Sequence, residues 1–259
     1  MPRLISAGRL MFAIGMLGLA FICILSQDFI IGRPPALPAQ LTGMAPLLGY
    51  GLALVVALSA IAVIVNHKYA AYGALVIGLL ILLSALFRQV PSFASQWLST
   101  LKSFFMVGGA IIIAATYTGE QRPLKTLRDE NWDVLIYVGC VFLAAFFIAG
   151  GYSHFLYAEF VKGFIPEYIP FHTFFTYFCA ICLFAGGIGI LIPATRRLAA
   201  LLSGIMVFGW FLLLHIPRFF ANMNDPSDRM GLCESFAFAG FFFALAGISE
   251  RKEISQPLP

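Results

Sequence analysis

Long apolar runs separated by short polar segments set the pattern of this chain. Each of eight runs is close to the 20 or so residues that an α-helix needs to cross a bilayer. The runs do not alternate between apolar and polar positions as half-buried strands do, and in lipid the backbone must form its hydrogen bonds internally. The sequence therefore predicts eight transmembrane helices, at residues 8–26, 46–65, 70–87, 103–118, 134–152, 173–193, 198–216 and 230–248.

Composition strengthens this interpretation and excludes a soluble protein. Hydrophobic residues make up 61% of the 259 residues and charged residues 11%, against about 45–50% and about 25% in soluble domains. So few charges cannot cover a water-soluble surface. The net charge of +4 arises from short loops, and no run of Lys and Arg with interleaved aromatic residues indicates a nucleic-acid partner. The expected surroundings are the lipid bilayer.

Loop charges predict the orientation of the helices. With the N-terminus inside, the inner segments hold ten Lys and Arg residues and the outer segments hold six, which is the usual bias of cytoplasmic loops. Arg3 and Arg9 precede the first apolar run as in a signal peptide, but no A-x-A-type cleavage site follows Leu25, so we expect a retained helix. Both termini are then cytoplasmic, and a bacterial inner membrane is the expected location.

An internal repeat divides the chain into two halves. Proline, three residues and proline occur at 34–38 and again at 166–170, each time after the first helix of a half. Residues 86–91 and 213–217 match in the same way and both end in proline. Four helices per half give both halves the same orientation. The expected fold is all-α, with parallel-repeat four-helix bundles at 1–118 and 134–259 and a cytoplasmic linker at 119–133.

Four short motifs stand out in the second half: GGYSHF at 150–155, FIPEYIP at 164–170, GGIGIL at 186–191 and RRLAA at 196–200. Together they resemble the DoxX/DoxD-like family of small four-helix membrane proteins. The resemblance covers about residues 134–220 and is weak in the first half, where Cys23 and Ile24 replace His154 and Phe155. It implies a membrane subunit that works with a redox partner and, in one branch of the family, with quinone.

Four ionisable residues fall at the outer ends of predicted helices. His154 and Glu159 lie at the end of the fifth helix, and His215 and Arg218 at the end of the seventh. Ionisable groups near hydrocarbon are costly and usually face a bundle interior or water. Because His moves protons and Arg binds anionic or carbonyl oxygens, we expect an outer polar site that could hold a quinone. The competing interpretation is a belt of interfacial anchors and helix-ending charges.

Cys179 and Cys182 form a C-x-x-C in the sixth run, and their spacing puts both thiols on one helix face. Such a pair could pass electrons to a quinone if one thiolate had a lowered pKa. The apolar surroundings favour two small buried hydrophobic residues instead. The sequence shows no metal-binding motif, so we expect no metal, and a haem held by His154 and His215 depends on a geometry that the sequence does not define.

Residues 152–164 have apolar positions at helical spacing. They could form a separate amphipathic helix that covers a cavity as a lid. We expect the simpler arrangement, in which they extend the fifth helix.

The leading functional hypothesis is a DoxX-like membrane subunit associated with a redox partner and quinone. A non-enzymatic membrane scaffold or assembly factor is the alternative from another class. A small-molecule carrier and a thiol–quinone oxidoreductase have less support, because few charges lie at mid-membrane and the cysteine pair is apolar. Whether the protein is an enzyme stays open at this point.

Overall fold

The computed structural model describes residues 2–255, and every regular element in this range is a helix. Eight of them are long: α1 (Pro2–Ser26), α2 (Ala45–Ile64), α3 (Ala70–Ser84), α4 (Phe93–Ala115), α5 (Asp129–Leu156), α7 (His172–Leu191), α8 (Pro193–Trp210) and α10 (Pro226–Ser255). The shorter helices are η1 (Ala39–Met44), η3 (Val90–Ser92), η4 (Gly119–Gln121), α6 (Ala158–Phe164) and α9 (Ile216–Ala221), together with the π-helices η2 (Ala85–Gln89) and η5 (Phe211–His215).

Seven helical stretches among the described residues are long and apolar enough to cross a bilayer. One of them, Ala70–Ala115, has 46 residues, about twice the length of a single crossing, and includes both α3 and α4. These helices fold back on each other, since a Cβ added to Gly78 would lie 2.9 Å from the Cβ of Ala110. The predicted all-α fold with eight crossing helices is confirmed, and the protein is an integral membrane protein.

Several helix ends differ from the apolar runs. The predicted run 103–118 starts ten residues too late and ends three residues too late, because α4 begins at Phe93 and ends at Ala115. The hydrophobicity pattern did not indicate residues 93–102 as part of this helix, because they include polar residues. They are compatible with a helix in a membrane, since the hydroxyls of Ser99 and Thr100 donate to the carbonyl of Gln96.

The order of the elements repeats along the chain. Each half has a first helix (α1 or α5), a short element (η1 or α6), a helix pair (α2 and α3, or α7 and α8), a π-helix (η2 or η5) and a last long helix (α4 or α10). Both π-helices end two residues before an aligned proline, Pro91 or Pro217. The sequence repeat is therefore kept in the backbone, including its least common element.

The two halves bury each other's first and last helices. α1 packs most extensively against α10, and α4 packs against α5. A Cβ on Gly8 would lie 2.6 Å from the carbonyl oxygen of Gly240, and a Cβ on Gly108 would lie 2.7 Å from that of Gly139. Small residues allow such close approach between membrane helices. The alignment of Cys23 with His154 also aligns Gly8 with Gly139. The repeat therefore relates the contact between α1 and α10 to the contact between α4 and α5.

The main core lies where α4, α5 and α10 meet. The ring of Phe105 packs against Phe147 at 5.9 Å and against Phe238 at 4.7 Å between ring centres. Phe241 and Phe242 of α10 are fully buried in the same cluster. Aromatic packing thus joins helices from both halves.

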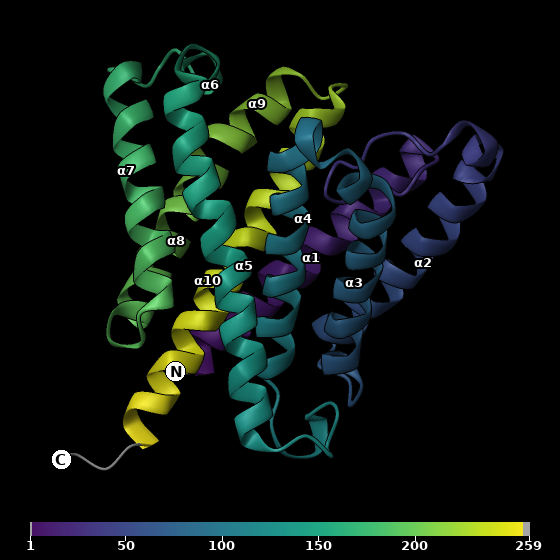
Figure 1. The fold of residues 1–259 in the computed structure, drawn as a ribbon, viewed down its shortest axis with the longest axis vertical. Helices are drawn as coiled ribbons and strands as arrows, with labels where there is room; N and C mark the ends of the chain where they lie inside the picture. The colour runs from purple at the N-terminus through teal and green to yellow at the C-terminus, as the bar shows by residue number, and fades with distance from the viewer. Residues whose placement is uncertain (1, 256–259) are drawn as a thin grey trace.

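Figure 1 shows both termini at one end of the molecule, together with the connection between α4 and α5. The short helices α6 and α9 lie at the opposite end, which we call the distal end. The even number of crossings places the termini on one side of the membrane.

Candidate functional site

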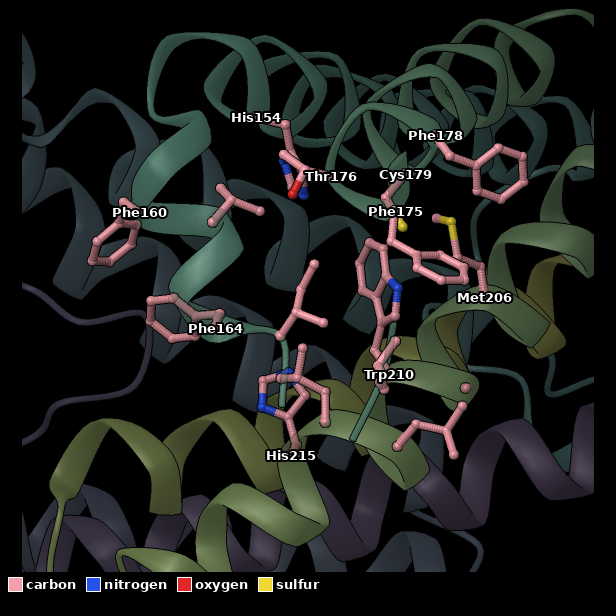
Figure 2. Close-up of a pocket in the computed structure, with 16 residues that line it drawn as sticks. His154, Phe160, Phe164, Phe175, Thr176, Phe178, Cys179, Met206, Trp210 and His215 are labelled. Carbon is pink, nitrogen blue, oxygen red and sulfur yellow. The ribbon is translucent and has the colours of Figure 1, made fainter. Parts of the chain in front are cut away.

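A cavity of about 540 Å³ lies at the distal end, among α5, α6, α7, α8 and η5. Its volume is within the range of about 300–1,000 Å³ that small-molecule sites occupy. Most of its lining is aromatic or aliphatic (Figure 2). The lining side chains that carry a polar atom or a thiol are His154, Thr176, Cys179, Trp210 and His215.

His154 enters the cavity from the last turn of α5. Its Nδ1 atom lies 2.7 Å from the carbonyl oxygen of Gly150, one turn earlier. A carbonyl only accepts hydrogen bonds, so Nδ1 carries the proton and donates. The Nε2 atom of the neutral ring is then a hydrogen-bond acceptor. Figure 2 shows this ring at one end of the cavity.

His215 stands at the opposite end of the cavity, at the end of η5 (Figure 2). Its ring lies against the backbone of α10, where a Cβ on Gly231 would be 2.8 Å from Nδ1. A glycine is therefore required at this position of α10 for the ring to keep its place. The two candidate histidines, 61 residues apart in the chain, line one site.

The π-helix η5 presents three consecutive residues to the cavity: Leu213, Leu214 and His215. The wider turn of a π-helix redirects side chains relative to an α-helix, and such turns often occur at functional sites. The hydroxyl of Tyr168 donates to the carbonyl of Leu213. This bond ties the segment after α6 to the wall that η5 forms.

The helix α6 covers the distal end of the cavity. Phe160, Val161 and Phe164 line the cavity, whereas Glu159 and Lys162 form an ion pair of 2.7 Å on the other face. The hydrogen bond from Lys162 to Glu159 raises the pKa of that amine. Since α5 ends at Leu156, the expectation that residues 152–164 simply extend the fifth helix is wrong: Tyr157, at φ −118° and ψ 40°, breaks it.

Glu159 and Arg218 lie outside the cavity lining. The side chain of Glu159 is 88% exposed. Arg218 donates through Nε to Asp228 at 2.9 Å, and its guanidinium carbon lies 4.3 Å from the centre of the Phe164 ring. Arg218 therefore supports α6, which we call the lid, through a cation–π contact with Phe164. It does not face the cavity.

Only one of the two cysteines of the C-x-x-C motif lines the cavity, although both lie on α7. Cys179 lines the cavity, and Cys182 is not among the lining residues. None of the five cysteines, all within the described range, is joined in a disulfide. Cys23 and Cys233 belong to the α1–α10 pair, where the sulfur of Cys233 packs over Gly18.

Trp210 and Thr176 are cavity residues that sequence reasoning missed. Trp210 ends α8, and Figure 2 shows its ring in the cavity wall near Cys179. Thr176 is buried on α7, where its hydroxyl donates to the carbonyl of His172. A tryptophan inside an apolar run was an available signal, but a belt of interfacial aromatic residues gives the same pattern.

The first half uses the aligned positions differently. Arg88 and Gln89 align with Leu214 and His215. Arg88 is bound to both carboxylate oxygens of Asp28 at 2.9 and 2.7 Å and to the carbonyl oxygens of Phe29 and Pro35. Gln89 donates to the carbonyl of Gly32 at 2.8 Å. In the first half, Arg88 and Gln89 fasten the loop that follows α1. In the second half, the residues at the aligned positions line a cavity.

A second polar cluster lies beside His215 in the distal part of α10. The buried carboxylate of Glu234 accepts from Lys102 at 3.0 Å and from Arg33 at 3.3 Å. Arg33 also donates to the carbonyl of Ser227. This cluster ties the first half to α10 and so supports the helix against which His215 rests.

Comparison with known families gives a match in the second half of the chain. A family described as a domain of unknown function, DUF8561, matches residues 143–228. All residues that line the cavity fall within this match. No curated protein and no solved structure matches the chain.

Proposed function

We propose that this protein is a membrane subunit that binds a quinone in the distal cavity and works with a redox partner. The observation that carries the proposal is the pair of histidines, His154 and His215, at opposite ends of one apolar, aromatic-walled cavity. A quinone ring has a carbonyl oxygen at each end and an apolar body, which fits this distribution of polar and apolar groups.

The two histidines would handle protons in this role. A bound quinone supplies two-electron chemistry coupled to two protons, with the electrons coming from a reduced partner protein. A protonated histidine can donate a hydrogen bond to a carbonyl oxygen, and a neutral histidine can accept a proton. His154 would act through Nε2, because its Nδ1 is engaged by Gly150. The walls formed by Trp210 and Phe164 would hold the ring and exclude water.

The proposed role also depends on how the protein is oriented in the membrane and on the family that it resembles. The excess of Lys and Arg on the terminal side supports cytoplasmic termini. With this orientation, the cavity would lie at the non-cytoplasmic face of a bacterial inner membrane. The DoxX/DoxD-like resemblance supports a redox partner.

Trp210 offers a direct test of quinone binding. The chain has three tryptophans, so Trp97→Phe with Trp132→Phe leaves Trp210, in the cavity lining, as the only tryptophan that reports by fluorescence. Titration with a short-chain benzoquinone should quench its emission with a saturable curve. His215→Ala should raise the Kd of the quinone by about threefold to tenfold, the loss of one hydrogen bond worth roughly 0.5–1.5 kcal/mol. His154→Ala should raise the Kd of the corresponding hydroquinone by a similar factor, because a hydroquinone hydroxyl can donate to Nε2.

His172→Ala is the matched control, because His172 lies at the start of α7 but not in the cavity lining. Its Kd should equal that of the parent protein. Quenching that never saturates would refute quinone binding. If a protein partner also stays bound through purification, that result would favour the scaffold alternative.

A further inference from the structure

The helices α7 and α8 separate towards the distal end. Near their connecting turn they are in close contact: a Cβ on Gly189 would lie 2.7 Å from the Cβ of Ala199, and one on Gly186 would lie 2.6 Å from the hydroxyl of Ser203. Further along α8, a Cβ on Gly209 would meet nothing within 4 Å. The pair therefore opens as a wedge whose wide end is at the level of the cavity (Figure 1).

Cavity-lining residues stand on both sides of this opening. Met206 and Gly209 line the cavity from α8, Leu213 from η5 and Phe178 from α7. We call the space between these four residues the α7–α8 gap. Phe178 is 48% exposed and Leu213 57% exposed. A side chain that both lines a cavity and faces outward marks a place where the cavity communicates with its surroundings.

At the α7–α8 gap the surroundings are lipid. All four residues belong to the stretches His172–Leu191 and Pro193–Ala221, which are apolar enough to cross the membrane. On the distal side, α6 places Phe160 and Phe164 over the cavity, and Phe160 is 67% exposed, so the cavity is open on this side too, beside the ion pair of Glu159 and Lys162. The four residues of the α7–α8 gap are apolar, so this lateral opening has no polar rim. On the distal side, by contrast, α6 presents Glu159 and Lys162 outward.

We infer that the ligand enters the cavity sideways from the bilayer through the α7–α8 gap, and that it carries an apolar tail which remains in this gap. The inference rests on the proposed function and specifies its ligand: a quinone with a long hydrocarbon chain, drawn from the membrane. A tail that leaves lipid gains nothing from the hydrophobic effect, because lipid is as apolar as the groove. A fitted groove favours the tailed ligand over the bare ring through the additional packing contacts along the tail.

Two ligands and two glycines test the inference. The protein with Trp210 as its only tryptophan is placed in lipid nanodiscs and titrated with a benzoquinone that has a ten-carbon tail and with the same ring without a tail. Gly209→Leu fills the α7–α8 gap, and Gly51→Leu is the matched control, because Gly51 is an exposed glycine of α2 that also has nothing within 4 Å of its Cβ position. Leu213→Phe narrows the gap from the side of η5.

The expected result is a larger loss for the tailed ligand than for the bare ring. Because Gly209 and Leu213 line the cavity, Gly209→Leu and Leu213→Phe should raise the Kd of the tailed ligand about tenfold more than they raise that of the bare ring, while Gly51→Leu changes neither. If both ligands bind but the variants affect them equally or not at all, lateral access is wrong and quinone binding stands. If neither ligand binds the parent protein, the proposed function fails, and the inference fails with it. Thermal unfolding of each variant shows that it has folded.

Discussion

At the scale of single residues, the position of His215 depends on a missing side chain. A Cβ on Gly231 would lie 2.8 Å from Nδ1 of the ring, closer than two such atoms can approach. Gly231→Ala should therefore force His215 away from α10 and lower the free energy of unfolding by about 1–3 kcal/mol, the usual cost of overpacking. In a protein that already carries His215→Ala, most of this cost should disappear, because the clash is gone.

A double-mutant cycle measured by thermal or denaturant unfolding in detergent checks this coupling. Gly163→Ala is the control on the lid, since nothing lies within 4 Å of its Cβ position. Equal destabilisation by Gly231→Ala with and without His215 would show that the ring does not rest on this glycine.

At the scale of elements, one buried ion pair fastens the distal loop after α1. The side chain of Arg88 is 5% exposed and that of Asp28 is 21% exposed. Arg88→Leu introduces the residue found at the aligned position, Leu214, and leaves the carboxylate of Asp28 without its partner. We expect a loss of about 3–5 kcal/mol in the free energy of unfolding, as for other buried pairs that lose one member.

Arg122→Leu is the comparison for this prediction. Arg122 pairs with Asp129 in the linker region, where the aspartate side chain is 88% exposed, and exposed pairs contribute at most about 1 kcal/mol. Denaturant unfolding of both variants should show the difference. Equal losses would mean that the pair of Arg88 and Asp28 contributes no more to stability than an exposed pair.

At the scale of the whole molecule, two close helix–helix contacts at glycine residues join the halves. Gly8 meets Gly240 in the α1–α10 pair, and Gly139 meets Gly108 in the α4–α5 pair. Because the repeat relates Gly8 to Gly139, valine at either position should have a similar effect. We expect each substitution to cost about 1–3 kcal/mol, with both halves unfolding together.

Thermal unfolding in detergent, followed by two probes, one in each half, checks both the size and the cooperativity of the effect. Gly51→Val on the exposed face of α2 should leave the midpoint nearly unchanged. Separate transitions for the two halves would contradict their mutual burial.

The sequence alone was sufficient for the elements that depend on local properties. Eight apolar runs of crossing length gave eight helices, since lipid leaves a chain of this composition no other way to satisfy its backbone. The repeat was legible because aligned prolines mark the same turn in both halves. The candidates His154 and His215 were selected by the cost of ionisable groups near hydrocarbon.

Only the tertiary structure decided which of those groups face one another. The separation of α6 from α5, the wedge between α7 and α8 and the inward turn of Trp210 depend on contacts between residues far apart in the chain. Glu159 and Arg218 have the same chemistry and depth as groups at a site, yet they point to water and to Asp228. Hydrophobicity is a property of each segment and can be read along the chain, whereas a cavity is space left between segments and exists only once they have packed.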